Sequence, residues 1–211
     1  MEWLIFIPLL LFSVIFHEVS HGLVALYEGD DTAYMAGRLT LNPVPHIDLV
    51  GSILFPAICF LSHLPTFGWA KPVPINPNRF HHYRSGVIKV SLAGPASNFL
   101  LAMVFLVFFY FFAMKIEVVQ RFPYLPIFLS QGILLNLVLA IFNLIPIPPL
   151  DGSKILSVIL PSELAMRYDA IEPYGFFIMM GLVAFGILGK ILYPLVSFSY
   201  SFLFSLIGVN G

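Results

Sequence analysis

The feature that most constrains this chain is a set of apolar runs long enough to cross a lipid bilayer. About 20 apolar residues of helix span a hydrocarbon core of about 30 Å. Runs of that order cover residues 4–27, 87–114 and 126–145, residues 174–209 are long enough for two, and residues 49–64 form a shorter run. With 59% hydrophobic and only 10% charged residues, the composition lies outside that of soluble domains. The sequence predicts an all-α polytopic membrane protein with about five to six membrane segments.

Charge and cysteine content exclude several other classes of protein. The net charge is −1 and no basic cluster alternates with aromatic residues, so no nucleic-acid partner is expected. The single cysteine, Cys59, excludes an intramolecular disulfide framework. The first apolar run is too long for a signal-peptide core and follows Met1-Glu2-Trp3, without a basic residue. We therefore expect a retained transmembrane helix.

Two loop segments are expected to be extended. Residues 37–42 alternate apolar and polar side chains and then meet prolines, which predicts a short strand. Residues 69–76 are punctuated by prolines that exclude a helix. Residues 65–86 hold Lys71, Arg79 and Arg84 but no acidic residue, which indicates a cytoplasmic loop.

The most informative motif is His17-Glu18-Val19-Ser20-His21, an H-E-x-x-H pattern inside the first apolar run. Residues four apart on a helix point to one side, so both imidazoles can grip one zinc ion while Glu18 acts as a general base toward water. The ordinary interpretation is that these are satisfied interior histidines. Three ionisable groups within an apolar helix cost several kcal/mol to bury, about 2.5 or more each, so we favour the metal site.

A third zinc ligand must come from elsewhere in the chain, and Asp151 is the strongest candidate. It follows three prolines at positions 146, 148 and 149, where a broken helix frees backbone groups that must face protein or water. An Asp-Gly pair after such a break could also be an ordinary turn or helix cap. If Asp151 meets the histidines, the first run and the run at 126–145 must point the same way. One opposite crossing, at 87–114, then separates them, and residues 49–64 must be re-entrant or surface-lying.

Together these motifs resemble the site-2 protease family of intramembrane metalloproteases, in its compact branch without a PDZ domain. Asn143-Leu144-Ile145-Pro146-Ile147-Pro148-Pro149-Leu150-Asp151-Gly152 matches the family's N-x-x-P-x-P-x-L-D-G element at every position, and Gly94-Pro95-Ala96-Ser97-Asn98 matches its G-P-x-x-N element. The resemblance implies that Asp151 is the third ligand of one catalytic Zn²⁺ and Glu18 the general base. It also implies a substrate-binding or oxyanion role for Asn98 and Asn143. His46, in a loop, could act as an electrophilic helper or have no role in catalysis.

The expected protein is a single membrane-embedded metalloprotease domain, 1–211. Its catalytic core covers about residues 1–160, and a C-terminal helical hairpin covers about 170–210. It should cleave transmembrane proteins or membrane peptides, from a multi-pass position in the cell membrane, with the active site inside the bilayer toward the cytoplasmic side. The strand near Leu39 could add the substrate as a further strand. The competing hypotheses are a membrane zinc transporter, with ligands along a path, and a non-catalytic scaffold of the same fold.

Overall fold

The structure, a computed structural model, describes residues 2–54, 58–59, 61, 70–113 and 115–208. Four helices within these residues are long and apolar enough to cross a membrane, over Phe6–Tyr27, Tyr83–Phe112, Leu125–Asn143 and Ile187–Leu206. No strand occurs in the described part of the chain. The prediction of an all-α polytopic membrane protein is confirmed.

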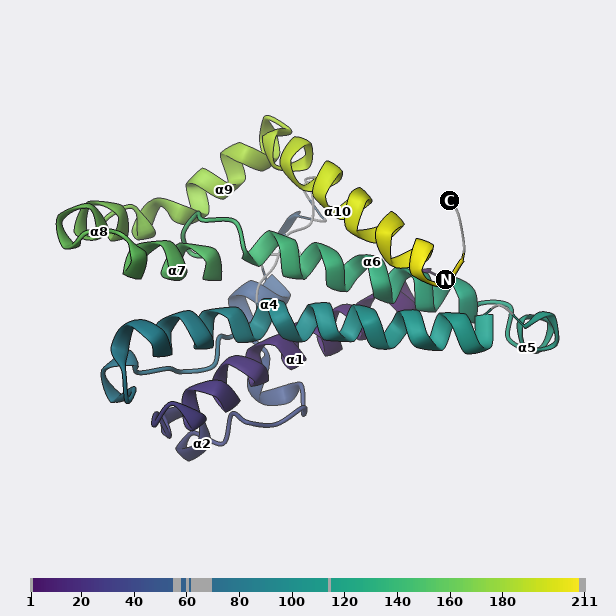
Figure 1. Cartoon of the computed structure of the whole chain (residues 1–211), viewed down its shortest axis with the longest axis horizontal. Helices are drawn as coiled ribbons and strands as arrows, with labels where there is room; N and C mark the ends of the chain where they lie inside the picture. Colours follow the sequence, from purple (N-terminus) through teal and green to yellow (C-terminus); the bar gives the residue numbers. More distant parts are fainter. Residues whose placement is uncertain (1, 55–57, 60, 62–69, 114, 209–211) are drawn as a thin grey trace.

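Three long helices form the centre of the molecule (Figure 1). Helix α4 (Tyr83–Phe108) packs against both α1 (Glu2–Tyr27) and α6 (Leu125–Asn143). Helices α1 and α6 run in one direction and α4 runs in the other. This is the arrangement that lets Asp151, which follows α6, meet the two histidines near the end of α1. Helix α10 (Ile187–Leu206) lies against α6 and adds to a core of Ala102, Leu106, Ile133, Leu137, Leu203 and Phe204.

Short helices and turns connect or flank these four. Between α1 and α4 in the chain come α2 (Thr32–Met35), the 3₁₀ turn η1 (Val44–His46), the π-helical η2 (Leu49–Leu54) and the 3₁₀ turn η3 (Pro77–Arg79). A π-helical turn, η4 (Phe109–Ala113), extends α4 toward α5 (Ile116–Arg121). After α6 come α7 (Asp151–Ile159), α8 (Ser162–Asp169), the 3₁₀ turn η5 (Glu172–Tyr174) and α9 (Gly175–Ala184).

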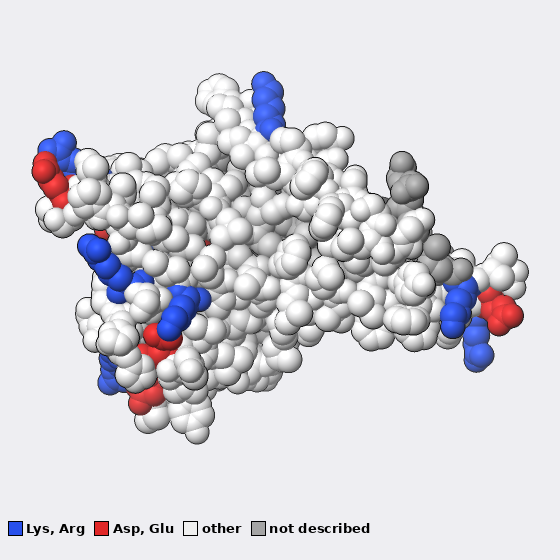
Figure 2. All heavy atoms as spheres, viewed as in Figure 1, with Lys and Arg blue, Asp and Glu red and all other residues white. Residues whose placement is uncertain are grey.

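The outer surface of the bundle is suited to lipid. Figure 2 shows most Lys, Arg, Asp and Glu side chains at the two ends of the long axis, with a broad uncharged surface between them. Large apolar side chains such as Phe177, Phe185 and Phe198 are exposed. A surface of this kind is stable only when hydrocarbon replaces water around it.

The break after α6 brings the chain back toward the bundle. Pro146, Pro148 and Pro149 cannot donate backbone hydrogen bonds, so the helix cannot continue through them. Helix α7 then begins at Asp151 and packs against α4. A Cβ on Gly152 would lie 2.2 Å from the Leu144 carbonyl oxygen, so only glycine allows this return.

The predicted strand at residues 37–42 is wrong. Gly37 has a φ of +64° and turns the chain, and the Arg38 N–H donates to the Ala33 carbonyl. The Thr40 carbonyl accepts from the His46 side chain, while the Asn42 N–H donates to the Thr40 hydroxyl. These backbone N–H and carbonyl groups therefore form hydrogen bonds within the loop and do not pair with a neighbouring strand. Residues 70–76 contain no helix, as expected.

The last two apolar runs differ from expectation in different ways. Residues 174–209 were expected to hold two spans, but α9 has ten residues and is about 15 Å long, too short to cross alone. It meets α10 at Gly186, whose φ is +66°. Of the run at 49–64, residues 55–57, 60 and 62–64 lie outside the described residues, so its re-entrant path stays a prediction.

A buried polar network joins the three central helices. The Asn136 side chain on α6 donates to the Ser13 hydroxyl on α1 at 3.0 Å and to its own helix at Gly132. Asn98 on α4 donates to Asn136 Oδ1 at 2.9 Å and to the Ser13 carbonyl at 3.2 Å. Ser13, Asn98 and Asn136 are all fully buried. Because each polar atom finds a partner, the network fixes the helices relative to one another without leaving an unsatisfied group.

Asn136→Ala should destabilise the protein by about 1–3 kcal/mol, because it strands polar atoms of Asn98 and Ser13 in the core. Asn143→Ala on the same helix is the matched control, since the Asn143 side chain is only half-buried and bonds its own helix at Leu139. Thermal unfolding in detergent measures both. Equal shifts in the two variants would contradict a helix-joining role for the network.

Candidate metal centre

Helix α1 presents two histidines to the same neighbour. His17 and His21 lie one turn apart, and both side chains are buried, at 6% and 5% exposure. Their ring centroids are 4.6 Å apart with the planes nearly perpendicular. The two Nε2 atoms lie 3.0 Å from each other.

Asp151 closes the cluster from the first residue of α7. Its Oδ2 lies 3.1 Å from His17 Nε2 and 3.0 Å from His21 Nε2. The carboxylate is buried at 5% exposure, and its other oxygen accepts from Lys154 at 3.3 Å. The predicted trio of His17, His21 and Asp151 is thus brought together from sequence positions more than a hundred residues apart.

Helix α4 fixes which nitrogen of each imidazole carries a proton. His17 Nδ1 lies 2.6 Å from Asn98 Oδ1, and His21 Nδ1 lies 2.6 Å from the Val90 carbonyl oxygen. The Asn98 amide nitrogen is occupied by donation to Asn136 and Ser13, so its oxygen faces His17. Both acceptors can only accept, so both Nδ1 atoms must donate.

The consequence is a cluster of lone pairs. When both imidazoles are neutral, with their protons on Nδ1, each Nε2 offers a lone pair, and both Nε2 atoms lie about 3 Å from a carboxylate oxygen. Three electron-rich atoms at this separation repel one another unless a cation lies among them. The donor set of two imidazoles and one carboxylate is typical of catalytic zinc, which takes three protein ligands and keeps one position open.

The distances fit such an ion. Zinc–ligand bonds of about 2.0–2.1 Å in a tetrahedral site place ligand atoms about 3.3 Å apart. The three separations here, 3.0–3.1 Å, are slightly shorter, and a small opening of the cluster would accommodate the metal.

Gly94 explains how α4 approaches so closely. A Cβ at this position would lie 2.4 Å from His17 Nε2 and 2.4 Å from His21 Nε2. The glycine of the G-P-x-x-N element therefore provides the space in which the two imidazoles meet.

Glu18 contacts a loop segment. Its Oε2 accepts a hydrogen bond from the Val73 backbone N–H at 2.8 Å, and the side chain is half-buried. The sequence did not predict this contact. The proline pattern around Val73 was visible, but nothing in it indicated a partner.

The remaining candidate residues have other partners. Asn98 lies directly behind His17, with both of its amide hydrogens used inside the protein. Asn143 bonds Leu139 on its own helix. His46 is buried at 2% exposure, donates from Nε2 to the Thr40 carbonyl and accepts from the Lys71 N–H through its own carbonyl. Sequence reasoning missed Asn136, although a lone asparagine in an apolar run is itself a signal of an interhelical hydrogen bond.

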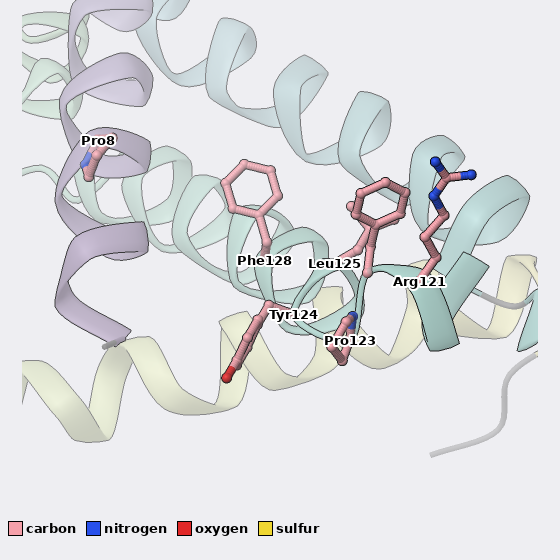
Figure 3. Close-up of a pocket in the computed structure, with 7 residues that line it drawn as sticks. Pro8, Arg121, Pro123, Tyr124, Leu125 and Phe128 are labelled. Carbon is pink, nitrogen blue, oxygen red and sulfur yellow. The ribbon is translucent and has the colours of Figure 1, made fainter. Parts of the chain in front are cut away.

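A separate apolar pocket lies at the other end of α1 (Figure 3). It has a volume of about 740 Å³ and is lined by Pro8, Phe128 and residues 121–125 of the α5–α6 connection. Pro8 precedes His17 by about 13 Å of helix. The pocket is therefore distinct from the histidine cluster.

Comparison with known proteins finds metalloproteases. Residues 124–185 match the family model of Peptidase family M50. A protein of Bacillus subtilis (strain 168) named "Putative zinc metalloprotease YwhC" is 38% identical over 190 residues, which cover 89% of this chain and 84% of that protein. "Zinc metalloprotease MJ0392" of Methanocaldococcus jannaschii is 28% identical over 161 residues, covering 76% of this chain and 36% of that protein. No solved structure matches the chain.

The fold, the converging side chains and these relatives define an integral-membrane zinc metallopeptidase. The chain belongs to peptidase family M50, the site-2 protease family that its motifs resemble.

Gly94→Ala should lower zinc affinity by at least about 10–100-fold, because the added methyl group displaces both imidazoles from the cluster. The control is Gly189→Ala, where an added Cβ has no neighbour within 4 Å. Zinc per chain, measured by mass spectrometry after dialysis, tests the pair. Full zinc occupancy in Gly94→Ala would show that the helix contact is not as close as described.

Proposed function

We propose that this protein is an intramembrane endopeptidase that hydrolyses peptide bonds of membrane-spanning substrates. In this proposal His17, His21 and Asp151 are the zinc ligands and Glu18 is the general base. The supporting observation is the convergence of three lone-pair atoms within about 3 Å of one another, with both Nδ1 protons directed away from the cluster.

His17, His21 and Asp151 would hold the zinc ion, which when bound would lower the pKa of water and polarise the scissile carbonyl. Glu18 takes the proton from the attacking water and transfers it to the leaving amine. Asn98 keeps His17 in the tautomer whose Nε2 is free, as a hydrogen-bonded outer partner of a ligand histidine does. With both amide hydrogens already used, Asn98 fits this positioning role better than an oxyanion role.

The substrate must present extended backbone at this site, because the amides of an intact helix are hydrogen-bonded and shielded. Residues 37–42 do not form the strand that was expected to receive it. The non-helical segment at residues 70–76 contacts Glu18 through the Val73 N–H.

We also propose that the site opens toward the cytoplasm. Arg38, Lys71 and Arg79 lie in the chain between α1 and α4, and Arg84 lies in the first turn of α4. Positive segments of this kind remain cytoplasmic. His17 lies about 20 Å along α1, so the ligands are within the depth of the bilayer and nearer this charged end.

Glu18→Gln should reduce cleavage of a single-span peptide by at least about 100–10,000-fold while zinc stays bound, because the amide cannot take a proton and is not one of the three ligands. His17→Ala should lose both zinc and cleavage. Peptide hydrolysis and zinc content of purified protein, with and without a chelator, measure the two effects. Wild-type activity in Glu18→Gln would refute the assignment of the base.

The purified protein in liposomes should not conduct zinc. Within the described residues the candidate ligands form one group, whereas a transporter needs ligands along a continuous path. A zinc-sensitive dye inside the liposomes measures flux, and cleavage of a membrane peptide in the same liposomes shows that the protein is active. Zinc flux that is lost in Asp151→Ala would favour the transporter hypothesis.

A further inference from the structure

A non-helical segment at residues 71–76, here called the strap, passes beside Glu18. Its sequence is Lys71-Pro72-Val73-Pro74-Ile75-Asn76, so the two prolines leave only some backbone N–H groups free to donate. The N–H of Val73 is the one that reaches the Glu18 carboxylate, at 2.8 Å.

One end of the strap is held by loop residues that follow α2. The Arg38 guanidinium donates to the Lys71 carbonyl at 2.8 Å and to the Pro72 carbonyl at 3.3 Å. The Lys71 N–H donates to the His46 carbonyl at 2.9 Å. Arg38 is only 8% exposed, so these bonds are shielded from water and fix the backbone directly before Val73.

The other end is held by the segment that follows α1. The Asn76 N–H donates to Asp30 Oδ2 at 2.6 Å, and Asp30 is fully buried. Burial raises the pKa of Asp30, but hydrogen bonds from Thr32 and Asn76 outweigh this effect and lower the pKa below its usual value. The carboxylate therefore stays ionised at neutral pH and remains a strong acceptor.

Between these anchors Val73 is also fixed by its side chain. The side chain is 5% exposed and lies against α1, where a Cβ on Gly22 would be 3.0 Å from Val73 Cγ1. Only Oε2 of Glu18 has a hydrogen-bond partner among the described residues. The contact thus occupies one carboxylate oxygen and leaves Oε1 available.

We propose that Val73 is a positioning residue whose backbone N–H holds Glu18 with Oε1 toward the attacking water. This inference rests on the proposed function, in which Glu18 is the general base. The Val73 N–H affects the reaction only through Glu18. A glutamate side chain has several rotamers, and one charge-assisted hydrogen bond from a fixed backbone selects among them. The Val73 N–H orients the base during the reaction and does not bind the substrate. Its loss therefore lowers kcat and leaves KM nearly unchanged.

The test replaces Val73 with its α-hydroxy analogue, which converts the amide to an ester, deletes the N–H and makes the Pro72 carbonyl a weaker acceptor for Arg38. The expected result is a fall in kcat of about 10–100-fold, with KM and zinc content unchanged. The matched control is the same replacement at Ile75, whose N–H has no hydrogen-bond partner among the described residues. Val73→Pro also removes the N–H and can be made by ordinary mutagenesis. If this variant folds, its kcat should fall as it does in the ester variant.

A second measurement is independent of catalysis. Amide hydrogen exchange at Val73 should accelerate at least about tenfold in Glu18→Ala, because its acceptor is gone, while Glu18→Gln keeps an acceptor oxygen and the protection. The Asn76 amide, held by Asp30, should be unchanged in both variants. If the wild-type protein cleaved no peptide, the proposed function would be wrong. Hydrogen exchange would still test whether the Val73 N–H donates to Glu18.

An ester variant at Val73 with wild-type kcat would overturn the inference, as would equal exchange at Val73 in wild type and Glu18→Ala. A rise in KM equal to the fall in kcat/KM would also overturn it, because the strap would then bind substrate instead of placing the base.

Discussion

The structure depends on one electrostatic constraint, which is that three electron-rich atoms meet where lipid surrounds the protein. His17, His21 and Asp151 place two Nε2 lone pairs and a carboxylate oxygen about 3 Å apart. Such a group is stable in a medium of low dielectric constant only when a cation compensates it. Asn98 and Val90 keep the Nδ1 protons on the far side of each ring, so the hydrogen bonds of the site leave both Nε2 atoms able to bind a metal ion.

Bringing these atoms together imposes conditions on the backbone. Helix α4 must approach α1 closely enough for its Val90 carbonyl to reach His21, and Gly94 makes this approach possible. Helix α6 must end before the site so that Asp151 can enter from a new helix, and the prolines and Gly152 provide the end and the return. The same helices share the network around Asn136, so the packing that supports the fold also sets the ligand geometry.

Much of the site could be predicted because its signals are local. The i, i+4 spacing of His17 and His21 determines that they share a face, and the proline break marks Asp151 as unusual. The resemblance to the site-2 proteases added Asn98. The contact between Val73 and Glu18 could not be foreseen, because it depends on how a loop folds over a distant helix. The strand at residues 37–42 was wrong for a related reason: alternation fits a strand, but no neighbouring strand exists in the described structure to receive its hydrogen bonds.

Adjacent residues on α1 are held by different parts of the protein because of helix geometry. Glu18 follows His17 directly, yet one residue rotates the side chain by about 100° around the helix axis. His17 therefore faces α4, whose Asn98 holds it, while Glu18 faces the loops, whose Val73 holds it. The proposed ligands are oriented by helix packing, and the proposed base is oriented by a loop segment held by Arg38 and Asp30. Under the proposed mechanism, changes in those loops alter the position of Glu18 and leave the His17–His21–Asp151 cluster in place.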